Sequence, residues 1–141
     1  MQLGKMFLLG FDGCTITPNT PLFSAIEQRD IGGVLLFDRN VDGSTQNFNS
    51  PEQLLALTTQ LQGLSPEPLL IAVDQEGGKV CRLKERNGFP PMPSAAELGQ
   101  QQDTQATTSA AEAMASTLAE YGINLNLAPV ADINLNPDNP I

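Results

Sequence analysis

The stretch PLLIAVDQEGG (residues 68–78) passes from a mainly apolar run to an acid, an amide and a second acid, and then to two glycines. A short apolar run without polar alternation is typical of a strand buried on both faces, as the strands of parallel sheets are. The polar residues follow where this strand would end. The segment therefore predicts a buried parallel strand that carries Asp74, Gln75 and Glu76 at its carboxyl end.

Three further apolar runs are bounded by turn residues and predict three more strands. They cover residues 6–11, 32–37 and 123–133. The last run alternates Asn124 and Asn126 with leucines, so we expect one of its faces to meet polar surroundings. The chain is thus expected to contribute four strands to one domain over residues 1–141, because domains commonly contain ~100 to 150 residues.

Helices are expected between the strands. Ser50 stands at an N-cap position, with a proline after it and Gln53 at the capping-box position, and the helix that follows has a leucine face and runs to Gly63. A longer Ala-rich helix is expected over residues 103–121, and its small residues would let it lie close to the sheet. A shorter helix over residues 22–29 would join the first two strands.

This alternation of strands and helices predicts an α/β fold with parallel strands and right-handed crossovers. All carboxyl ends then lie at one edge, which is where α/β barrels and open α/β sheets bind ligands. The acids expected at that edge are Asp12, Asp38, Asp74, Glu76 and Asp132. An Asp after a strand is often only a turn former, so a purely structural role stays open for the acids at positions 12, 38 and 132.

Asp74 stands apart because ionisable residues and glycines cluster after it. Two glycines follow Glu76, and Lys79 and Arg82 come next. The cluster lacks the residue spacing of phosphate-binding, dinucleotide-binding and calcium-binding loops. Sugar hydroxyls both donate and accept hydrogen bonds, so a carboxylate flanked by the Gln75 amide and the Arg82 guanidinium suits a sugar better.

Composition argues against several other classes of function. Seven Lys and Arg against sixteen Asp and Glu give a formal net charge of −9, which disfavours binding to nucleic acids and to anionic membranes. The apolar run near the N-terminus is too short for a signal sequence or a membrane span, so a cytoplasmic protein is expected. The chain contains no His and only two Cys, so neither a metal site nor a disulfide framework is expected.

Five segments together resemble a known family. They are GFDG (10–13), IGGVLLFDRN (31–40), PLLIAVDQEGGKVCRL (68–83), FPPMPSAAELG (89–99) and YGINLNLAPVADINLNPDNPI (121–141). In order and spacing they resemble the amino-terminal part of glycoside hydrolase family 3, in particular its bacterial β-N-acetylhexosaminidase branch. The resemblance covers essentially the whole chain, and five ordered segments are far more specific than any one of them.

The resemblance implies the first half of a TIM-type (β/α)₈ barrel, since a complete barrel takes ~250 residues. It also implies a retaining hydrolase, without metal or organic cofactor, that releases terminal N-acetylglucosamine from glycans, in many bacteria from peptidoglycan turnover fragments. The family residue that corresponds to Asp74 holds sugar hydroxyls, and the one that corresponds to Arg82 lies near the same site. Asp132 corresponds to an acid with a supporting role at the rim. Lys79 stands where family members usually have Arg, which removes a planar hydrogen-bonding fork.

The same resemblance places the reactive groups elsewhere. A retaining hydrolase needs a nucleophile and a general acid/base ~5 to 5.5 Å apart, and in this branch both come from segments that would follow Ile141. We therefore expect an amino-terminal piece that is inactive alone and that associates with itself or with the carboxyl-terminal half of the barrel. The alternative is a non-catalytic glycan-binding or sensory module. A more remote alternative, an α/β enzyme with an open doubly wound sheet, would call for a dinucleotide-binding glycine run that the sequence lacks.

Overall fold

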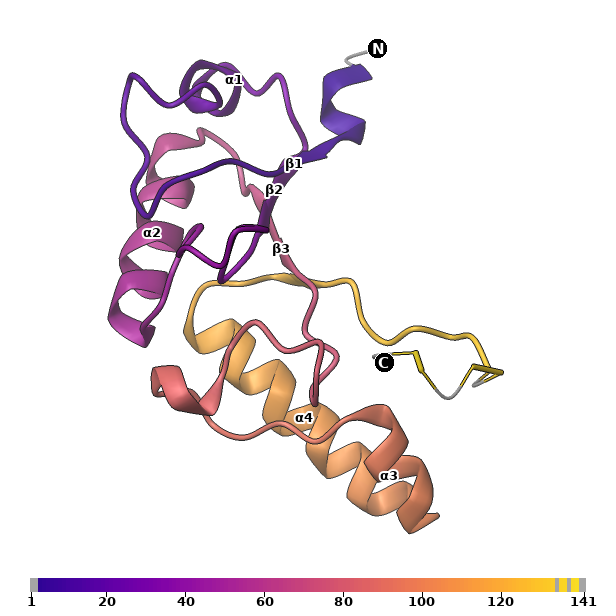
Figure 1. Cartoon of the computed structure of the whole chain (residues 1–141). Helices are drawn as coiled ribbons and strands as arrows, with labels where there is room; N and C mark the ends of the chain where they lie inside the picture. The colour runs from indigo at the N-terminus through magenta and orange to yellow at the C-terminus, as the bar shows by residue number, and fades with distance from the viewer. Residues whose placement is uncertain (1–2, 134, 137, 140–141) are drawn as a thin grey trace.

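The computed structural model describes residues 3–133, 135–136 and 138–139, and within them it shows a sheet of four strands in the order β1-β2-β3-β4 (Figure 1). The strands are β1 (Leu8–Leu9), β2 (Gly33–Leu36), β3 (Leu70–Val73) and β4 (Leu125–Asn126). Each strand pairs in parallel with its neighbour in the sheet. The prediction of an α/β fold with four parallel strands is confirmed.

Helices connect consecutive strands. They are α1 (Phe23–Glu27), α2 (Pro51–Leu64), α3 (Ala95–Gln101) and α4 (Thr104–Glu120), and short 3₁₀ turns cover Leu3–Met6 and Glu85–Asn87. α1 contacts α2, and α3 contacts α4 on the other side of the molecule (Figure 1). The three predicted helices are present, and α3 is an additional one. Among the described residues, no helix has the length and apolar character needed to cross a bilayer.

Capping interactions place the ends of the two long helices. Ser50 Oγ accepts a hydrogen bond from the Gln53 N–H at 3.3 Å, as its predicted N-cap position requires. The Gln53 side chain accepts from the Asn49 N–H at 2.8 Å rather than from that of Ser50, so the capping box is only half formed. Gly122, just after α4, has a φ of 74°, which suits the C′ position of a helix.

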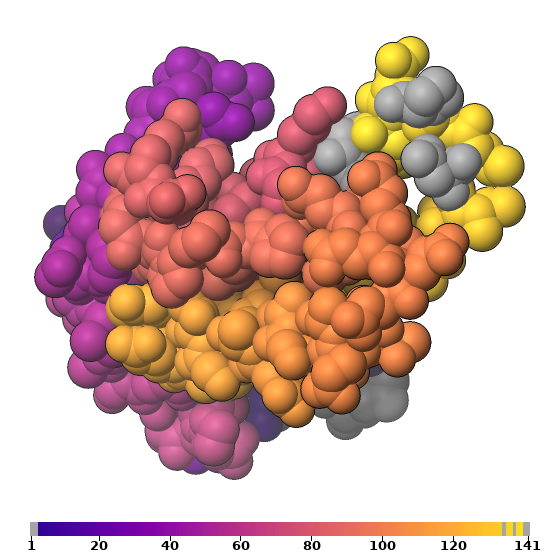
Figure 2. All heavy atoms as spheres, turned by 90° about the horizontal axis from the view of Figure 1, so that it is seen from below, coloured from indigo at the N-terminus to yellow at the C-terminus, as the bar shows by residue number. Residues whose placement is uncertain are grey.

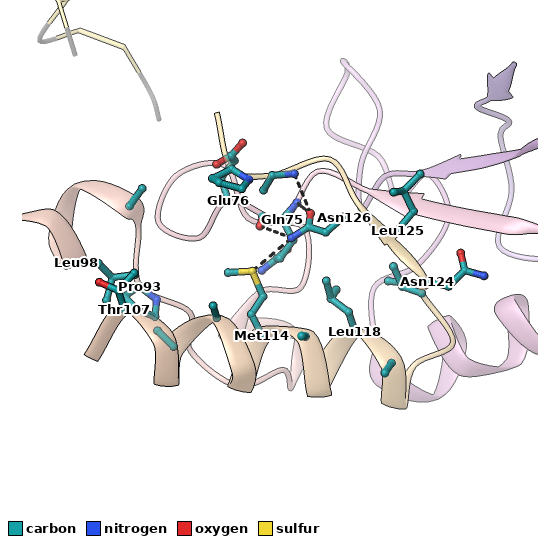
Figure 3. A pocket seen from close by; sticks show the side chains of 18 of the residues that line it. Gln75, Glu76, Pro93, Leu98, Thr107, Met114, Leu118, Asn124, Leu125 and Asn126 are labelled. Carbon is teal, nitrogen blue, oxygen red and sulfur yellow. Dashed lines mark hydrogen bonds between the residues drawn. The ribbon is translucent and has the colours of Figure 1, made fainter. Parts of the chain in front are cut away.

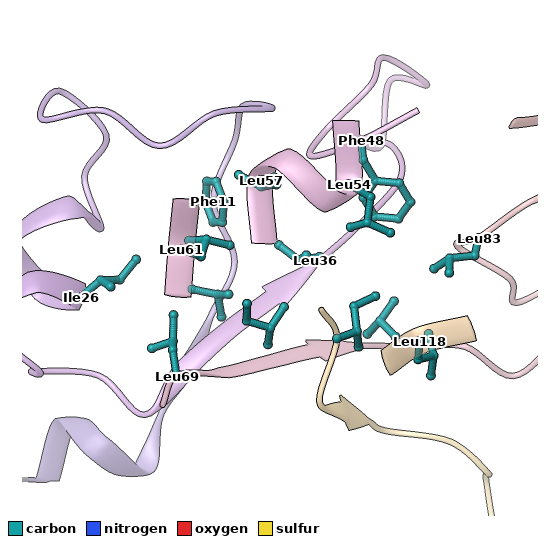
Figure 4. Packing of buried hydrophobic residues seen from close by; sticks show 14 of the residues in the cluster. Phe11, Ile26, Leu36, Phe48, Leu54, Leu57, Leu61, Leu69, Leu83 and Leu118 are labelled. Carbon is teal, nitrogen blue, oxygen red and sulfur yellow. The ribbon is translucent and has the colours of Figure 1, made fainter. Parts of the chain in front are cut away.

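The core lies between α2 and the sheet (Figure 4). Leu54, Leu57 and Leu61 on one face of α2 have no exposed surface. They belong to one buried cluster with Leu36 of β2 and Val73 of β3. Fully burying a Leu or Val side chain contributes about 1.5 to 3 kcal/mol, so this face of α2 holds the helix on the sheet. It is the leucine face that the sequence predicts.

The two outer strands are shorter than the sequence predicts. β4 has two residues of the predicted 123–133, and β1 has two of the predicted 6–11. After β4, Pro129 has no N–H to donate to a strand ladder. After β1, the Phe11 carbonyl accepts hydrogen bonds from the side chains of Asn47 and Gln46, at 2.9 and 3.2 Å, instead of from a neighbouring strand. Side-chain bonding thus replaces the ladder after β1, and the missing N–H of Pro129 interrupts it after β4.

The small-residue face of α4 does not lie close to the sheet. Ala110, Ala111, Met114 and Ala115 help to line a cavity of about 690 Å³ among α3, α4 and β4. Figure 2 shows α3 and α4 running across this side of the molecule, and Figure 3 shows Met114 pointing into the cavity. The expectation of close packing is therefore wrong, because this cavity lies between the small-residue face of α4 and β4.

The centre of the sheet gives a direct test of the fold. Val73 in β3 is fully buried, so Val73→Asp would place a carboxylate in a strand that is covered on both faces. We expect this substitution to remove at least about 3 kcal/mol of folding stability or to leave the chain unfolded. Urea denaturation followed by circular dichroism measures the effect. Leu70→Asp is the matched control because Leu70 in the same strand is 44% exposed, and equal losses in both variants would contradict this placement of β3.

Candidate functional site

The buried amide of Gln75 holds the loop that follows β3. Its Oε1 accepts hydrogen bonds from the backbone N–H groups of Arg82 and Leu83 at 2.8 and 3.0 Å. Its Nε2 donates to the sulfur atoms of Cys81 and Met92 at 3.1 and 2.8 Å. Because the Gln75 side chain has no exposed surface, its amide fixes the loop from inside. The expectation that this amide faces a ligand is wrong.

Asn126 of β4 ties Gln75 to the sheet (Figure 3). Asn126 Oδ1 accepts from the Gln75 N–H and Asn126 Nδ2 donates to the Gln75 carbonyl, both at 3.1 Å. Asn124 makes the equivalent pair of bonds one step earlier, accepting from the Ile71 N–H at 2.7 Å and donating to the Leu69 carbonyl at 2.8 Å. The two asparagines therefore bond to the backbone of β3 and of the residues on either side of it.

The glycine pair lets the loop pass close to the segment before α3. Gly77 and Gly78 have φ values of 85° and 55°, which favour glycine. A Cβ on Gly77 would lie 2.1 Å from the Pro93 carbonyl oxygen, and a Cβ on Gly78 would lie 2.7 Å from Ser94 Cβ. Ser94 caps α3, and hydrogen bonds from its backbone N–H and hydroxyl lower the pKa of Glu97. The glycines thus serve packing against the protein's own backbone.

Glu76 also turns inward. Its side chain is buried, and its two carboxylate oxygens lie 3.1 and 3.3 Å from the Val130 backbone nitrogen, which donates to them. This interaction holds the chain after β4 against the loop after β3. Glu76 is therefore engaged within the protein, although the sequence places it among the acids of the rim.

Arg82 lies between two carboxylates at the carboxyl edge of the sheet. Its Nη2 is 3.6 Å from Asp74 Oδ2, and its Nη1 is 3.9 Å from Asp38 Oδ1. The guanidinium carbon is 5.2 Å from the centre of the Phe37 ring, within the range of a cation–π contact. The side chains of Asp74 and Arg82 are 38% and 22% exposed, so a ligand can reach both.

Asp38 is the buried member of this cluster. Its side chain is 4% exposed, and its Oδ2 accepts a hydrogen bond from Lys84 Nζ. Asp38 Oδ1 and Arg82 Nε are both buried without a hydrogen-bond partner in the described part of the chain. β2 and β3 are neighbours in parallel register, which explains why residues that follow these two strands meet at one edge.

Asn47 aligns the ends of β1 and β2. Its Oδ1 accepts from the Phe37 N–H at 2.9 Å, and its Nδ2 donates to the carbonyls of Phe11 and Gly13 at 2.9 and 3.2 Å. The side chain is fully buried. Nothing in the local sequence marks this residue, since a loop asparagine is usually a turn former.

The other predicted site residues lie outside this cluster. Asp132, Lys79 and Asp12 are exposed, and their side chains make no hydrogen bond or ion pair with the described residues. The structure therefore brings Asp74 and Arg82 together but does not bring Asp132 to them, and a binding role for each stays a prediction. Among the residues that the structure describes, no group of His, Cys, Asp and Glu is arranged to hold a metal ion.

The cavity beside α4 is not this polar site. Its wall is mainly apolar, with Leu98, Met114 and Leu118 among its side chains (Figure 3). The polar groups of Gln75 and Glu76 that border it already have hydrogen-bond partners within the protein. A hydroxyl-rich ligand would find few partners there, so the candidate site is the cluster around Arg82.

The four charged residues Asp38, Asp74, Arg82 and Lys84 form a cluster at the carboxyl edge of the sheet, here called the rim cluster. It offers a carboxylate and a guanidinium beside the aromatic ring of Phe37. Such paired groups can bind adjacent hydroxyls of one ligand, because the carboxylate accepts and the guanidinium donates. Fold and site together define the class: an α/β protein with a candidate ligand site, formed by polar side chains, at the carboxyl edge of its parallel strands.

Comparison with known proteins identifies the family. The sequence model described as "Glycosyl hydrolase family 3 N terminal domain" matches residues 2–141, and the chain belongs to this family. A β-hexosaminidase from Nitrosomonas eutropha is 38% identical over 140 residues, which are 95% of this chain and 37% of that protein. The chain spans 20% to 37% of the length of three curated relatives that it matches.

Solved structures agree with this assignment. A family 3 β-N-acetylglucosaminidase from Paenibacillus sp. FPU-7 superposes with a TM-score of 0.81 at 35% identity, over 99% of this chain and 25% of that one. NagZ from Neisseria gonorrhoeae, in complex with N-trifluoroacetyl-D-glucosamine, superposes with a TM-score of 0.71 at 30% identity, over 91% of this chain and 37% of that one. The neighbours are family 3 barrel domains, so the four strands correspond to part of a TIM-type barrel.

The role of Gln75 predicts a large stability effect. Gln75→Leu would leave the N–H groups of Arg82 and Leu83 buried without acceptors, and each unsatisfied group costs about 1 to 3 kcal/mol. We expect a loss of about 2 to 4 kcal/mol in folding free energy, measured by urea denaturation. Gln105→Leu, at an exposed position of α4, should change stability little. A loss no greater than that of the control would show that Gln75 does not hold the loop.

Proposed function

We propose that the protein to which this chain belongs is a retaining glycoside hydrolase that releases terminal N-acetylglucosamine, and that this chain supplies part of its sugar site. The observation that carries the proposal is the position of Arg82, held between Asp74 and Asp38 at the carboxyl edge of a family 3 domain. The names of the relatives support the substrate, since they are β-hexosaminidases and β-N-acetylglucosaminidases.

Within this proposal Asp74 and Arg82 bind the sugar. The half-exposed Asp74 carboxylate accepts hydrogen bonds from ring hydroxyls, and the Arg82 guanidinium donates to a hydroxyl oxygen beside it. Asp132 has the supporting role that the family resemblance implies, and its exposed position leaves its carboxylate available to a ligand or to a further segment.

The chemistry proposed for the complete protein is a double displacement. It needs a nucleophile and a general acid/base ~5 to 5.5 Å apart across the anomeric carbon. Asp38 and Glu76 are buried and already paired, and Asp74 is paired with Arg82, so these carboxylates suit binding and support better than bond cleavage. We assign the reactive groups to segments beyond the part of the family domain that this chain covers.

We further propose that the glycan comes from peptidoglycan turnover and is processed in the cytoplasm. The resemblance of the five sequence segments to the bacterial β-N-acetylhexosaminidase branch supports the source of the glycan. The net charge of −9 is compatible with a substrate that is neither nucleic acid nor anionic lipid.

A chimera tests the proposed activity. Residues 1–141 replace the matching region of the Nitrosomonas eutropha relative, and hydrolysis of 4-nitrophenyl N-acetyl-β-D-glucosaminide is measured. We expect activity, and we expect Asp74→Ala in the chimera to lower kcat/KM by about 100-fold because charged hydrogen bonds to hydroxyls are lost. Lys79→Ala should stay within about threefold, since Lys79 is exposed and its side chain makes no hydrogen bond or ion pair with the described residues.

Two results would contradict this assignment. One is a chimera that folds, by circular dichroism and thermal melting, but does not cleave the substrate. The other is full activity after Asp74→Ala. Rapid turnover by the isolated 141-residue chain would show instead that the reactive groups lie within it.

A non-catalytic glycan-binding module is the second candidate. It is favoured by the fact that the Asp74 and Arg82 pair is formed in this chain without the rest of the barrel. Calorimetry separates the two candidates. Saturable binding of N-acetylglucosamine to the isolated chain, abolished by Asp74→Ala, favours the module, whereas millimolar or absent binding favours the hydrolase piece.

The open edges of the sheet lead to a prediction about partners. In the described part of the chain β1 and β4 each have one unpaired edge, and Leu9 and Leu127 beside them are 36% and 45% exposed. Open edges bind further strands, so we propose that the chain pairs with itself or with the carboxyl-terminal half of a family 3 barrel. Light scattering should show a mass that rises with concentration above 15.0 kDa.

Charged edges provide the control for this association. Leu9→Lys combined with Leu127→Lys should lower the apparent mass, because lysine on an edge strand opposes pairing. A soluble monomer at high concentration in the unmodified chain would contradict the prediction.

A further inference from the structure

The position of Asp38 at the edge of the sheet is explained neither by a role in a turn nor by direct sugar binding. The side chain is 4% exposed, so a ligand does not reach it. Its two carboxylate oxygens nevertheless face two different cations, with Arg82 near Oδ1 and Lys84 on Oδ2. Burying a carboxylate is unfavourable unless a cation accompanies it, and here one carboxylate serves both.

The charges of the rim cluster balance because of Asp38. Asp38 and Asp74 supply two negative charges, and Arg82 and Lys84 supply two positive charges, so the cluster as a whole is neutral. Without the Asp38 charge the cluster would be positive by one unit. The side chains of Arg82 and Lys84 are only 22% and 16% exposed, and a charge that water screens poorly attracts anionic ligands to its surroundings.

Asp38 acts on Arg82 through charge more than through a hydrogen bond. The distance of 3.9 Å from Asp38 Oδ1 to Arg82 Nη1 is too long for a hydrogen bond, and both Oδ1 and Arg82 Nε lack a partner among the described residues. The guanidinium is meanwhile held over the Phe37 ring at 5.2 Å and faces Asp74 on its exposed side. Asp38 thus fixes both the position and the effective charge of the group that a ligand meets.

We propose that Asp38 is a positioning residue that makes the rim select an uncharged sugar over an acidic one. It keeps Arg82 over Phe37 and cancels the charge of Lys84, so that no net positive charge remains to recruit a carboxylate. This inference rests on the proposed sugar site and adds the reason for its substrate class.

A nuclear magnetic resonance titration tests the inference on the ¹⁵N-labelled chain, at a concentration below the onset of self-association. The Arg82 Nε–H and Asp74 amide signals report binding of N-acetylglucosamine and, separately, of glucuronic acid. The unmodified chain should bind N-acetylglucosamine more tightly. Asp38→Asn should shift the ratio of the two dissociation constants toward glucuronic acid by about fivefold, because the loss of one negative charge leaves the cluster positive by one unit and attracts the carboxylate of that sugar.

Three further variants distinguish an effect of charge on the ratio of the two dissociation constants from a general loss of structure. Lys84→Met should shift the ratio of the two dissociation constants by a similar factor in the opposite direction. If Asp38→Asn does not fold, Lys84→Met still tests the inference. The double variant Asp38→Asn/Lys84→Met should return the ratio to that of the unmodified chain. Asp30→Asn makes the same change at an exposed Asp before β2, at the opposite edge of the sheet, and should leave the ratio unchanged.

The outcomes distinguish this inference from the proposed function. N-acetylglucosamine binding with the same ratio in Asp38→Asn and in Lys84→Met overturns the role of Asp38 and leaves the sugar site intact. An equal shift in Asp30→Asn overturns it as well. If neither sugar moves the signals of the unmodified chain even at millimolar concentration, the inference about Asp38 is overturned, and the chimera assay decides separately whether the proposed sugar site stands.

Discussion

The buried amide of Gln75 is the contact on which the polar rim depends. One side-chain oxygen accepts from two successive backbone N–H groups, those of Arg82 and Leu83, while Asn126 holds the backbone of Gln75 to the sheet. These bonds bring the loop back toward the strand it left. Asp74, one residue before the amide, and Arg82, whose backbone the amide holds, therefore face each other at the same edge. Without these bonds, the carboxyl ends of the parallel strands would still lie at one edge of the sheet. Arg82 would not, however, be held beside Asp74.

The sequence predicts the fold well because parallel strands and capped helices have strong local signals. The leucine face of α2 and the Ser50 cap are as predicted. The lengths of β1 and β4 are not. The ladder after β1 is replaced by bonds from distant side chains such as Asn47, and the ladder after β4 is interrupted at Pro129. Helix α3 was missed, although Ser94 and Glu97 form the capping box that could have indicated it.

The site was only partly predictable for a similar reason. Asp74 and Arg82 could be chosen from their clustering, but the direction of a side chain after a strand depends on the loop's own hydrogen bonds. Gln75 and Glu76, which the sequence places beside a ligand, point inward and stabilise the loop. The sequence also cannot rank Asp38 above other strand-end acids, because its two cationic partners follow a different strand. Some polar residues of the loop thus stabilise it from inside, while Asp74 and Arg82 stay partly exposed at the edge of the sheet.

The central claim is that the partly exposed pair of Asp74 and Arg82 is a sugar site at the carboxyl edge of a family 3 domain. The most direct test is a crystal structure of the chain soaked with N-acetylglucosamine. The account predicts the sugar at this edge, with ring hydroxyls within hydrogen-bonding distance of the Asp74 carboxylate and the Arg82 guanidinium. Sugar bound only in the apolar cavity beside α4, or an Asp74 turned inward and away from a well-ordered sugar, would contradict it.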